Sequence, residues 1–219
     1  MCGRYTVFTE DEEMAEMKAI IQEVNHKFGG DAVATGEIFP TNVAPILTLD
    51  NNRLAPRPIS WGFPRWDGKG VLINARSESA LQKPMFAAPL MTRRCVIPST
   101  GFYEWAYAAQ PDLQMSFFDA DLKPKSNAKT PKVKFFFRRP NEPMLYMAGM
   151  INTFTDNEGN QKDAFIILTT AATSYMAQFH NRMPVILQRS ECEDWINNKA
   201  FMHEVLRREG SVLEHRIAG

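Results

Sequence analysis

Hydrophobic and polar residues follow two different periods along this chain, and the first is helical. Between residues 10 and 26 the apolar side chains recur every three or four positions, and Thr9 forms a capping box with Glu12. The pattern predicts a helix that begins at about Glu10 and ends at about His26, just before two glycines. Its apolar residues are Met14, Met17, Ile21 and Val24.

Beyond residue 38 the apolar runs become short and are separated by prolines and turn residues. Two of these runs flank Asn51 and Asn52, a pair typical of a tight hairpin turn. Many short strands separated by turns favour a folded-over antiparallel or barrel-like sheet. The predicted strands occupy pieces of 38–63 and then 71–75, 95–97, 101–105, 133–137, 144–151 and 164–170.

The end of the chain returns to a helical pattern. Ser190 forms a second capping box with Glu193, and residues 190–219 are predicted as a C-terminal helical region. Residues 106–132, which contain several prolines, are predicted as a surface insertion between two strands. Because no linker-like shift in composition divides the chain, residues 1–219 are predicted to form one α+β domain. Its β core is mainly antiparallel and barrel-like, with flanking helices.

Composition narrows the class of protein. A chain of 219 residues with 44% hydrophobic residues can bury a sizeable core, which excludes a disulfide-stapled miniprotein and a disordered chain. Its three cysteines are widely spaced and form no CxxC pair, so we expect no disulfide framework, no metal and no cofactor. The chain begins without a signal sequence and has no long apolar run. We therefore expect a cytoplasmic protein that does not enter a membrane.

The formal net charge is zero at pH 7, which taken alone argues against nucleic acid as a partner. The charges are nevertheless separated along the chain: residues 53–94 hold eight basic and two acidic residues, and residues 123–139 hold seven basic residues and no acid. Aromatic residues interrupt the first stretch, as in sites for single-stranded nucleic acid. Trp66, beyond a proline, is predicted to stack on or wedge between bases, whereas Trp61 is predicted to lie in the core.

Cys2 is the most informative residue for chemistry. If Met1 is removed, Cys2 presents an α-amine and a thiol on adjacent carbons, with ordinary pKa values of about 8 and about 8.5. Such a group can attack an acyl carbon as a thiolate, or condense with an aldehyde and close to a thiazolidine ring. The alternative is a small second residue that serves only efficient processing. Nearby Arg4 could lower the thiol pKa or hold an anionic substrate; the alternative is a simply solvated charge.

Three further positions are candidates for the same chemistry. Asn74 and Arg76 alternate onto one face of an extended segment, where they suit binding of an oxyanion or phosphate, unless that face is simply exposed. Glu104 lies inside an aromatic run; it is either exposed or desolvated, and desolvation would raise its pKa toward general acid/base catalysis. His180 is suited to proton transfer near pH 7, although a lone histidine is often structural.

In combination, these motifs resemble the SOS response-associated peptidase (SRAP) family, in the same order, from residue 2 to about residue 187. The motifs are MCGRY at 1–5, NVAP at 42–45, WGFP at 61–64 with Trp66, INAR at 73–76 with Glu78, CVIP at 95–98 followed by GFYEW at 101–105, and HNRMP at 180–184. The last residues lack the Val-Ser segment associated with the family, so its closing strand is not carried over to this chain.

The resemblance implies a monomeric DNA damage response protein that loses Met1 and uses Cys2 to capture abasic sites in single-stranded DNA. The product would be a thiazolidine DNA–protein crosslink, accompanied by weak lyase activity and self-processing peptidase activity. By the same resemblance, Asn74 would hold the amine of Cys2, and Glu104 and His180 would transfer protons.

The family pattern also assigns DNA contacts. By this pattern Arg4 and Arg76 would bind backbone phosphates. Together with the stacking predicted above for Trp66, this makes single-stranded DNA with abasic sites the expected partner. When bound to damaged DNA, the protein would be associated with the nucleoid.

Two other classes of protein remain open from the sequence. An N-terminal-nucleophile amidohydrolase, such as a glutamine amidotransferase domain, would also use Cys2 but would leave Glu104 and His180 without a role. In a non-catalytic single-stranded DNA-binding module, Cys2 would be incidental.

Overall fold

Five strands close into a small barrel at the centre of the structure, a computed structural model that describes residues 2–8, 14–107, 131–156 and 158–218. Neighbours around the ring are antiparallel except β4 and β12, which run parallel. In ring order the strands are β12 (Gln161–Ala171), β4 (Arg53–Trp61), β3 (Val43–Asp50), β8 (Arg94–Ser99) and β11 (Leu145–Thr155), which pairs back with β12.

Short strands extend this barrel on the side of the candidate site. The strand β7 (Asn74–Arg76) adds to β12 in parallel, and β13 (Arg182–Pro184) adds to it antiparallel. Directly after β13, β14 (Ile186–Leu187) pairs with β11, and Val185 between them bonds to Leu168 of β12 and Ala148 of β11. A small hairpin of β5 (Phe63–Pro64) and β6 (Val71–Leu72) projects residues 65–70 beyond the barrel.

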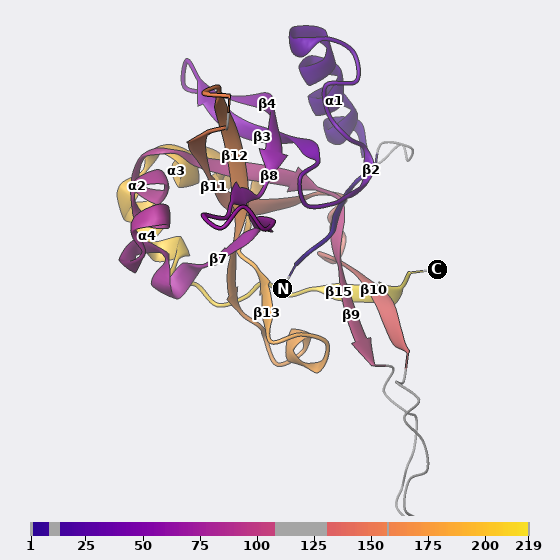
Figure 1. Cartoon of the computed structure of the whole chain (residues 1–219). Coiled ribbons are helices and arrows are strands. Elements are labelled where there is room, and N and C mark those ends of the chain that lie inside the picture. Colours follow the sequence, from indigo (N-terminus) through magenta and orange to yellow (C-terminus); the bar gives the residue numbers. More distant parts are fainter. Residues whose placement is uncertain (1, 9–13, 108–130, 157, 219) are drawn as a thin grey trace, which may run out of the picture.

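A second sheet of five strands lies beside the barrel (Figure 1). All of its pairs are antiparallel, and its order is β15 (Glu214–Ile217), β10 (Lys132–Arg138), β9 (Gly101–Tyr107), β1 (Tyr5–Val7) and β2 (Gly36–Ile38). Tyr5, Phe102 and Phe137 lie on one face of this sheet and are fully buried. The amino-terminal strand is therefore an interior strand of this sheet.

Helices cover the outside of the strands. In Figure 1, α2 (Pro84–Thr92), α3 (Cys192–Asn197) and α4 (Lys199–Val205) gather on one side, and α1 (Ala15–Phe28) stands at another. Three short 3₁₀ segments complete the described chain: η2 (Ser77–Gln82), η3 (Met176–Gln178) and η4 (Arg189–Glu191). The predicted α+β class and the mainly antiparallel, barrel-like core are confirmed.

Several local predictions hold in detail. Asn51 and Asn52 turn the β3–β4 hairpin with φ values of 50° and 60°, the left-handed conformation that such hairpin turns require. The other predicted ranges each contain a strand, most of them longer than the sequence pattern indicated. The predicted strand at 71–75 is wrong as a single strand, because it divides into β6, which pairs with β5, and β7, which pairs with β12. The first helix runs to Phe28 instead of His26, and Thr9, Glu12 and its predicted start lie outside the described residues.

The predicted C-terminal region needs two corrections. The capping box joins Gln188 to Glu191, not Ser190 to Glu193, because the Glu191 carboxylate accepts from the backbone N–H of Gln188 at 2.8 Å and starts the turn earlier. The region 190–219 is helical only to Val205, and residues 214–217 form the edge strand β15. Its polar sequence gives no strand signal, and its partner β10 is distant along the chain.

The predicted surface insertion at residues 106–132 needs a correction at both ends. Its ends belong to strands, since β9 runs through Tyr107 and β10 begins at Lys132, and residues 108–130 lie outside the described part of the chain.

Gly149 lies in a closely packed part of the barrel. It is on β11, opposite Cys95 of β8 and Ile167 of β12. A Cβ atom at this position would lie 2.4 Å from Cδ1 of Ile97 and 2.6 Å from the carbonyl oxygen of Ile166. That carbonyl belongs to a barrel strand, so it cannot yield without shifting the strand.

We expect Gly149→Ala to lower the free energy of unfolding by about 1–3 kcal/mol, the usual cost of overpacking a close-packed core. Gly30→Ala is the matched control, because a Cβ there meets nothing within 4 Å. Urea denaturation of both variants measures the difference. Equal stability of the two would show that the barrel has slack at Gly149.

Candidate active site at the amino terminus

Cys2 lies fully buried where the barrel meets the second sheet. Figure 1 places the amino terminus between β7 and β13 on one side and β9 and β15 on the other. The side-chain amide Nδ2 of Asn74 donates to the carbonyl oxygen of Cys2 at 3.0 Å, and the backbone N–H of Tyr103 donates to the carbonyl oxygen of Arg4 at 2.9 Å. Both sheets therefore hold the first residues in place.

Asn74 has a second polar atom at the same place. Its Oδ1 is buried and accepts no hydrogen bond from the described residues. A buried amide oxygen without a donor is costly, so a group that supplies an N–H there would be favoured. An α-amine on Cys2 is such a group.

Burial, and next the negative charge of Glu104, raise the pKa of the Cys2 thiol well above its ordinary value. The thiol is therefore protonated at neutral pH in this structure. Glu104 itself is only 6% exposed on β9 and shares the inward face with Phe102. Of the two alternatives for this carboxyl group, the structure shows the buried one.

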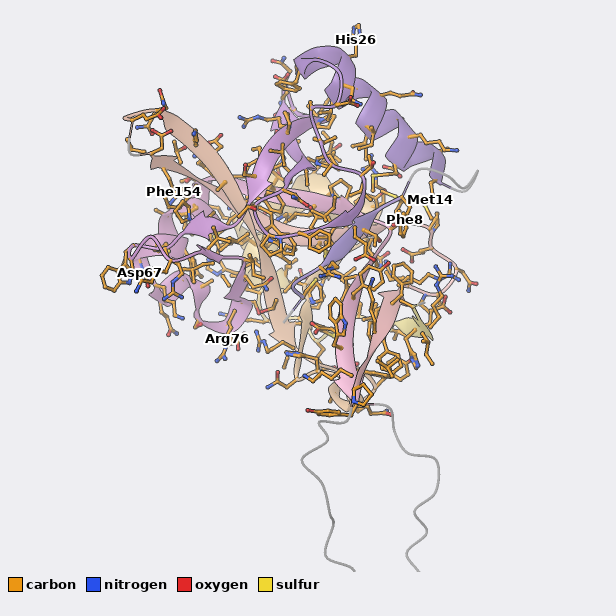
Figure 2. All side chains as sticks on the ribbon, turned by 45° about the vertical axis from the view of Figure 1, so that its right-hand side comes forward. Phe8, Met14, His26, Asp67, Arg76 and Phe154 are labelled. Carbon is orange, nitrogen blue, oxygen red and sulfur yellow. The ribbon has the colours of Figure 1, made fainter. Side chains whose placement is uncertain are left out.

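The strand β7 has the predicted alternation. Asn74 is half-buried, Ala75 is buried and the side chain of Arg76 is exposed. Figure 2 shows Arg76 and Asp67 on the same side of the molecule. The guanidinium of Arg76 is therefore accessible to a phosphate group.

An ion pair that the sequence reasoning missed ties this strand to the His180 segment. Arg182, on β13, donates to both carboxylate oxygens of Glu78 at 2.7 and 2.8 Å and to the carbonyl oxygen of Thr169 at 2.6 Å. The hydrogen bond from Arg182 lowers the pKa of Glu78. The sequence does contain a sign of this ion pair: Glu78 lies two residues after Arg76, and the oppositely charged Arg182 lies two residues after His180.

His180 is oriented by its own turn. Its backbone N–H donates to the carbonyl oxygen of Met176 at 3.0 Å, and its Nδ1 lies 3.0 Å from the backbone N–H of Arg182. The carbonyl oxygen of Arg182 also lies 3.3 Å from Nδ1 and could only accept, but the N–H contact is shorter and favours Nδ1 as the acceptor, with the proton on Nε2. The imidazole can donate this proton.

Arg4 is held by the protein. Its guanidinium lies 4.1 Å from the ring centroid of Phe39 and 4.8 Å from that of Trp105, and it donates to Glu37 at 3.1 Å. Lys134 pairs with the other carboxylate oxygen of Glu37. Arg4 is therefore not a simply solvated charge. A phosphate could contact it only through guanidinium nitrogens that are not bonded to Glu37.

The two tryptophans separate as predicted. Trp61 is fully buried and donates from Nε1 to the carbonyl oxygen of Ile73 at 3.1 Å. Trp66 is 91% exposed in the turn between β5 and β6, where Arg65 donates twice to Asp67 at 3.2 and 3.1 Å. An exposed indole on a braced turn can stack on a base.

The basic stretch 53–94 does not form a single surface. Arg57 and Arg93 share the carboxylate of Asp163 at 3.1 and 2.9 Å, and Arg94 is buried, with a 2.9 Å bond to the carbonyl oxygen of Leu90. Counting charges along the chain could not reveal this, because Asp163 comes from a distant strand.

The remaining candidate chemistries are limited. Cys95 and Cys192 are buried, and burial raises both thiol pKa values, that of Cys192 to about 12. Within the described ranges, no three His, Cys, Asp or Glu side chains are grouped closely enough to hold a metal ion. None of the helices in those ranges is both long and apolar enough to cross a membrane.

Several known proteins resemble this chain in sequence or in fold. The chain is 34% identical over 212 residues to the abasic site processing protein YoqW of Bacillus subtilis, covering 91% of this chain and 81% of that protein. It is 24% identical over 200 residues to the abasic site processing protein YedK of Escherichia coli, with the same coverage of 91% and 81%. A crystal structure of a protein from Bacteroides thetaiotaomicron shares the fold, with a TM-score of 0.72 and 22% identity over 99% of this chain and 91% of that one.

The family model described as "SOS response associated peptidase (SRAP)" matches residues 1–214. Because this match spans nearly the whole chain, the protein belongs to the SRAP family.

Proposed function

We propose that this protein processes abasic sites in single-stranded DNA by forming a covalent crosslink through Cys2. The names of the relatives YoqW and YedK support the substrate. The observation that supports the chemistry is the contact between Asn74 and Cys2. The Nδ2 of Asn74 donates to the carbonyl oxygen of Cys2, and the Oδ1 of the same amide has no hydrogen-bond donor among the described residues.

The first step is removal of Met1 by hydrolysis, which frees the α-amine of Cys2. The Oδ1 atom of Asn74 then accepts a hydrogen bond from this amine. That bond directs the nitrogen lone pair away from the amide oxygen. An abasic deoxyribose equilibrates with its open-chain aldehyde, the electrophile that such an amine attacks. The amine adds to the aldehyde carbon, water leaves, and an imine forms.

Ring closure completes the crosslink. The thiol sulfur adds to the imine carbon, its proton passes to the nitrogen, and a thiazolidine ring results without any oxidant or reductant. Because the thiol is protonated in the buried site, the amine reacts first and the thiol gives up its proton only as the ring closes. The buried carboxyl group of Glu104, whose charge acts on this thiol, is the proposed base in this step.

His180 has the complementary role. An Nε2–H donor can protonate the ring oxygen of the sugar as it opens, or the hydroxyl that leaves as water. Lyase activity follows if the imine undergoes β-elimination before the thiol closes the ring.

DNA would reach this site along an exposed path. Arg76 projects from β7, two residues after Asn74, and would bind a backbone phosphate. Trp66 offers a ring to a base. Arg4 would add a phosphate contact from the opposite side of the amino terminus.

Incubation with single-stranded DNA that contains one abasic site, followed by a denaturing gel and intact-mass measurement, tests the proposal. We expect a stable adduct with the natural protein and none with Cys2→Ala. Cys2→Ser keeps the amine but cannot form the thiazolidine, so its adduct should survive only after borohydride reduction. Cys192→Ser, which changes a buried cysteine away from Asn74, is the control and should crosslink normally.

Other outcomes distinguish the competing classes. Binding without an adduct would indicate a non-catalytic DNA-binding module. Hydrolysis of glutamine without an adduct would indicate the amidohydrolase.

Glu104→Gln keeps the shape of the side chain but removes the base. We expect crosslinking at saturating DNA to slow by about 10²-fold to 10⁴-fold, the usual contribution of a general base, while the Kd for DNA stays within about twofold. Single-turnover kinetics and a binding titration measure the two quantities. A large loss of affinity with a normal rate would make Glu104 a structural residue.

Arg76→Ala should weaken DNA binding and make its dependence on salt shallower. Loss of one phosphate contact on single-stranded DNA changes the slope of log K against log[salt] by about 0.7. Arg189→Ala is the control, because that arginine pairs with Glu16 of α1, away from β7. An unchanged slope for Arg76→Ala would remove this residue from the DNA path.

A further inference from the structure

Residues 172–181 form the segment that carries His180 from β12 to β13. Backbone hydrogen bonds close this segment on itself, from Ala172 N to Asn181 O at 3.2 Å and from His180 N to Met176 O at 3.0 Å. These bonds fix its shape. Its position relative to the second sheet depends on side-chain contacts.

The first contact is made by Phe179, the neighbour of His180. Its ring meets those of Phe135 and Phe137 on β10 edge-on, with centroids 4.8 and 5.1 Å apart. Phe135 is the cross-strand partner of Glu104. The residue beside one proposed proton-transfer group thus packs on the strand partner of the other.

The second contact comes from the last strand. The ring of His215, on β15, lies 4.6 Å from that of Phe179 and 5.4 Å from that of Phe135. Its Nδ1 also forms a hydrogen bond with the hydroxyl of Tyr175, at the other end of the same segment. His215 therefore contacts both the sheet and the segment that bears His180.

Burial does not account for His215 at this place. The side chain is exposed, on an edge strand whose other residues are polar or exposed, so it contributes little to the core. Its contacts instead join two parts of the molecule: Phe135 and Phe137 from β10, Tyr175 and Phe179 from the His180 segment. We call these five residues the aromatic cluster.

We propose that His215 is a positioning residue, which holds the His180 segment against the second sheet and so sets the approach of His180 to the reacting sugar beside Glu104. This inference rests on the proposed function, because it presumes that both groups transfer protons. Small displacements of such groups cost large factors in rate. A strand that the family motifs do not include would thereby take part in catalysis without touching the substrate.

Substitutions at His215 test the proposal through rate and affinity separately. We expect His215→Ala to slow crosslinking at saturating abasic DNA by about tenfold or more, with the Kd for DNA within about twofold. His215→Phe, which restores a ring in the cluster, should recover the rate to within about threefold of the natural protein. Glu214→Gln is the matched control: it breaks the ion pair with Arg138 on the same strands, leaves the cluster intact and should crosslink normally.

Hydrogen exchange on the free protein provides a readout that does not depend on the reaction. We expect His215→Ala to speed exchange in residues 173–181, and Glu214→Gln to leave it unchanged. If the natural protein forms no adduct, the proposed function fails, and exchange alone decides whether His215 holds the segment. Unchanged exchange in His215→Ala, or a rate that His215→Phe does not rescue, would overturn the positioning role.

Discussion

The structure depends on the placement of the amino-terminal strand inside a sheet. The strand β1 lies between β2 and β9, and its residues Tyr5 and Val7 are fully buried. Tyr5 packs edge-on against Trp61 of the barrel, with ring centroids 5.0 Å apart. A chain end is usually free to fray, but here the first residues belong to the core. Cys2, three residues before β1 begins to pack on Trp61, is therefore held at the junction of the two sheets.

In the proposed reaction, desolvation at this junction would determine whether the amine or the thiol of Cys2 reacts first. A buried thiol next to a carboxylate stays protonated, so it is a poor first nucleophile. The amine, which Asn74 can orient, reacts first in the proposed sequence, and the sulfur then traps the imine in a ring. In that proposed sequence, the burial that suppresses a simple thiolate reaction would favour a product in which the nitrogen and the sulfur of Cys2 are both bonded to the sugar carbon.

Several cations of this protein are paired with acidic side chains of the same chain. Two carboxylates each form ion pairs with two cations: Asp163 with Arg57 and Arg93, and Glu37 with Arg4 and Lys134. Arg182 forms an ion pair with Glu78. A net charge of zero is therefore compatible with a localised DNA path, because the acids hold cations that brace the fold. Arg76 and Trp66 are exposed, and the proposed function assigns them to contacts with DNA.

The sequence by itself determined the class of fold and the residue types of the site. Local spacing carries that information: the Asn51 and Asn52 turn, the alternation through Asn74 and Arg76, and the position of Cys2 at the chain start. These features depend only on near neighbours and on the two-residue period of a strand.

Only the tertiary structure decided which of those groups meet and which are committed elsewhere. The Asn74 contact with Cys2, the burial of Glu104 and the closing strand with His215 arise from pairing between residues far apart in the chain. The sequence pattern missed that strand because the four residues of β15 are polar or exposed, and a strand of this kind is defined by its partner rather than by its own hydrophobic period.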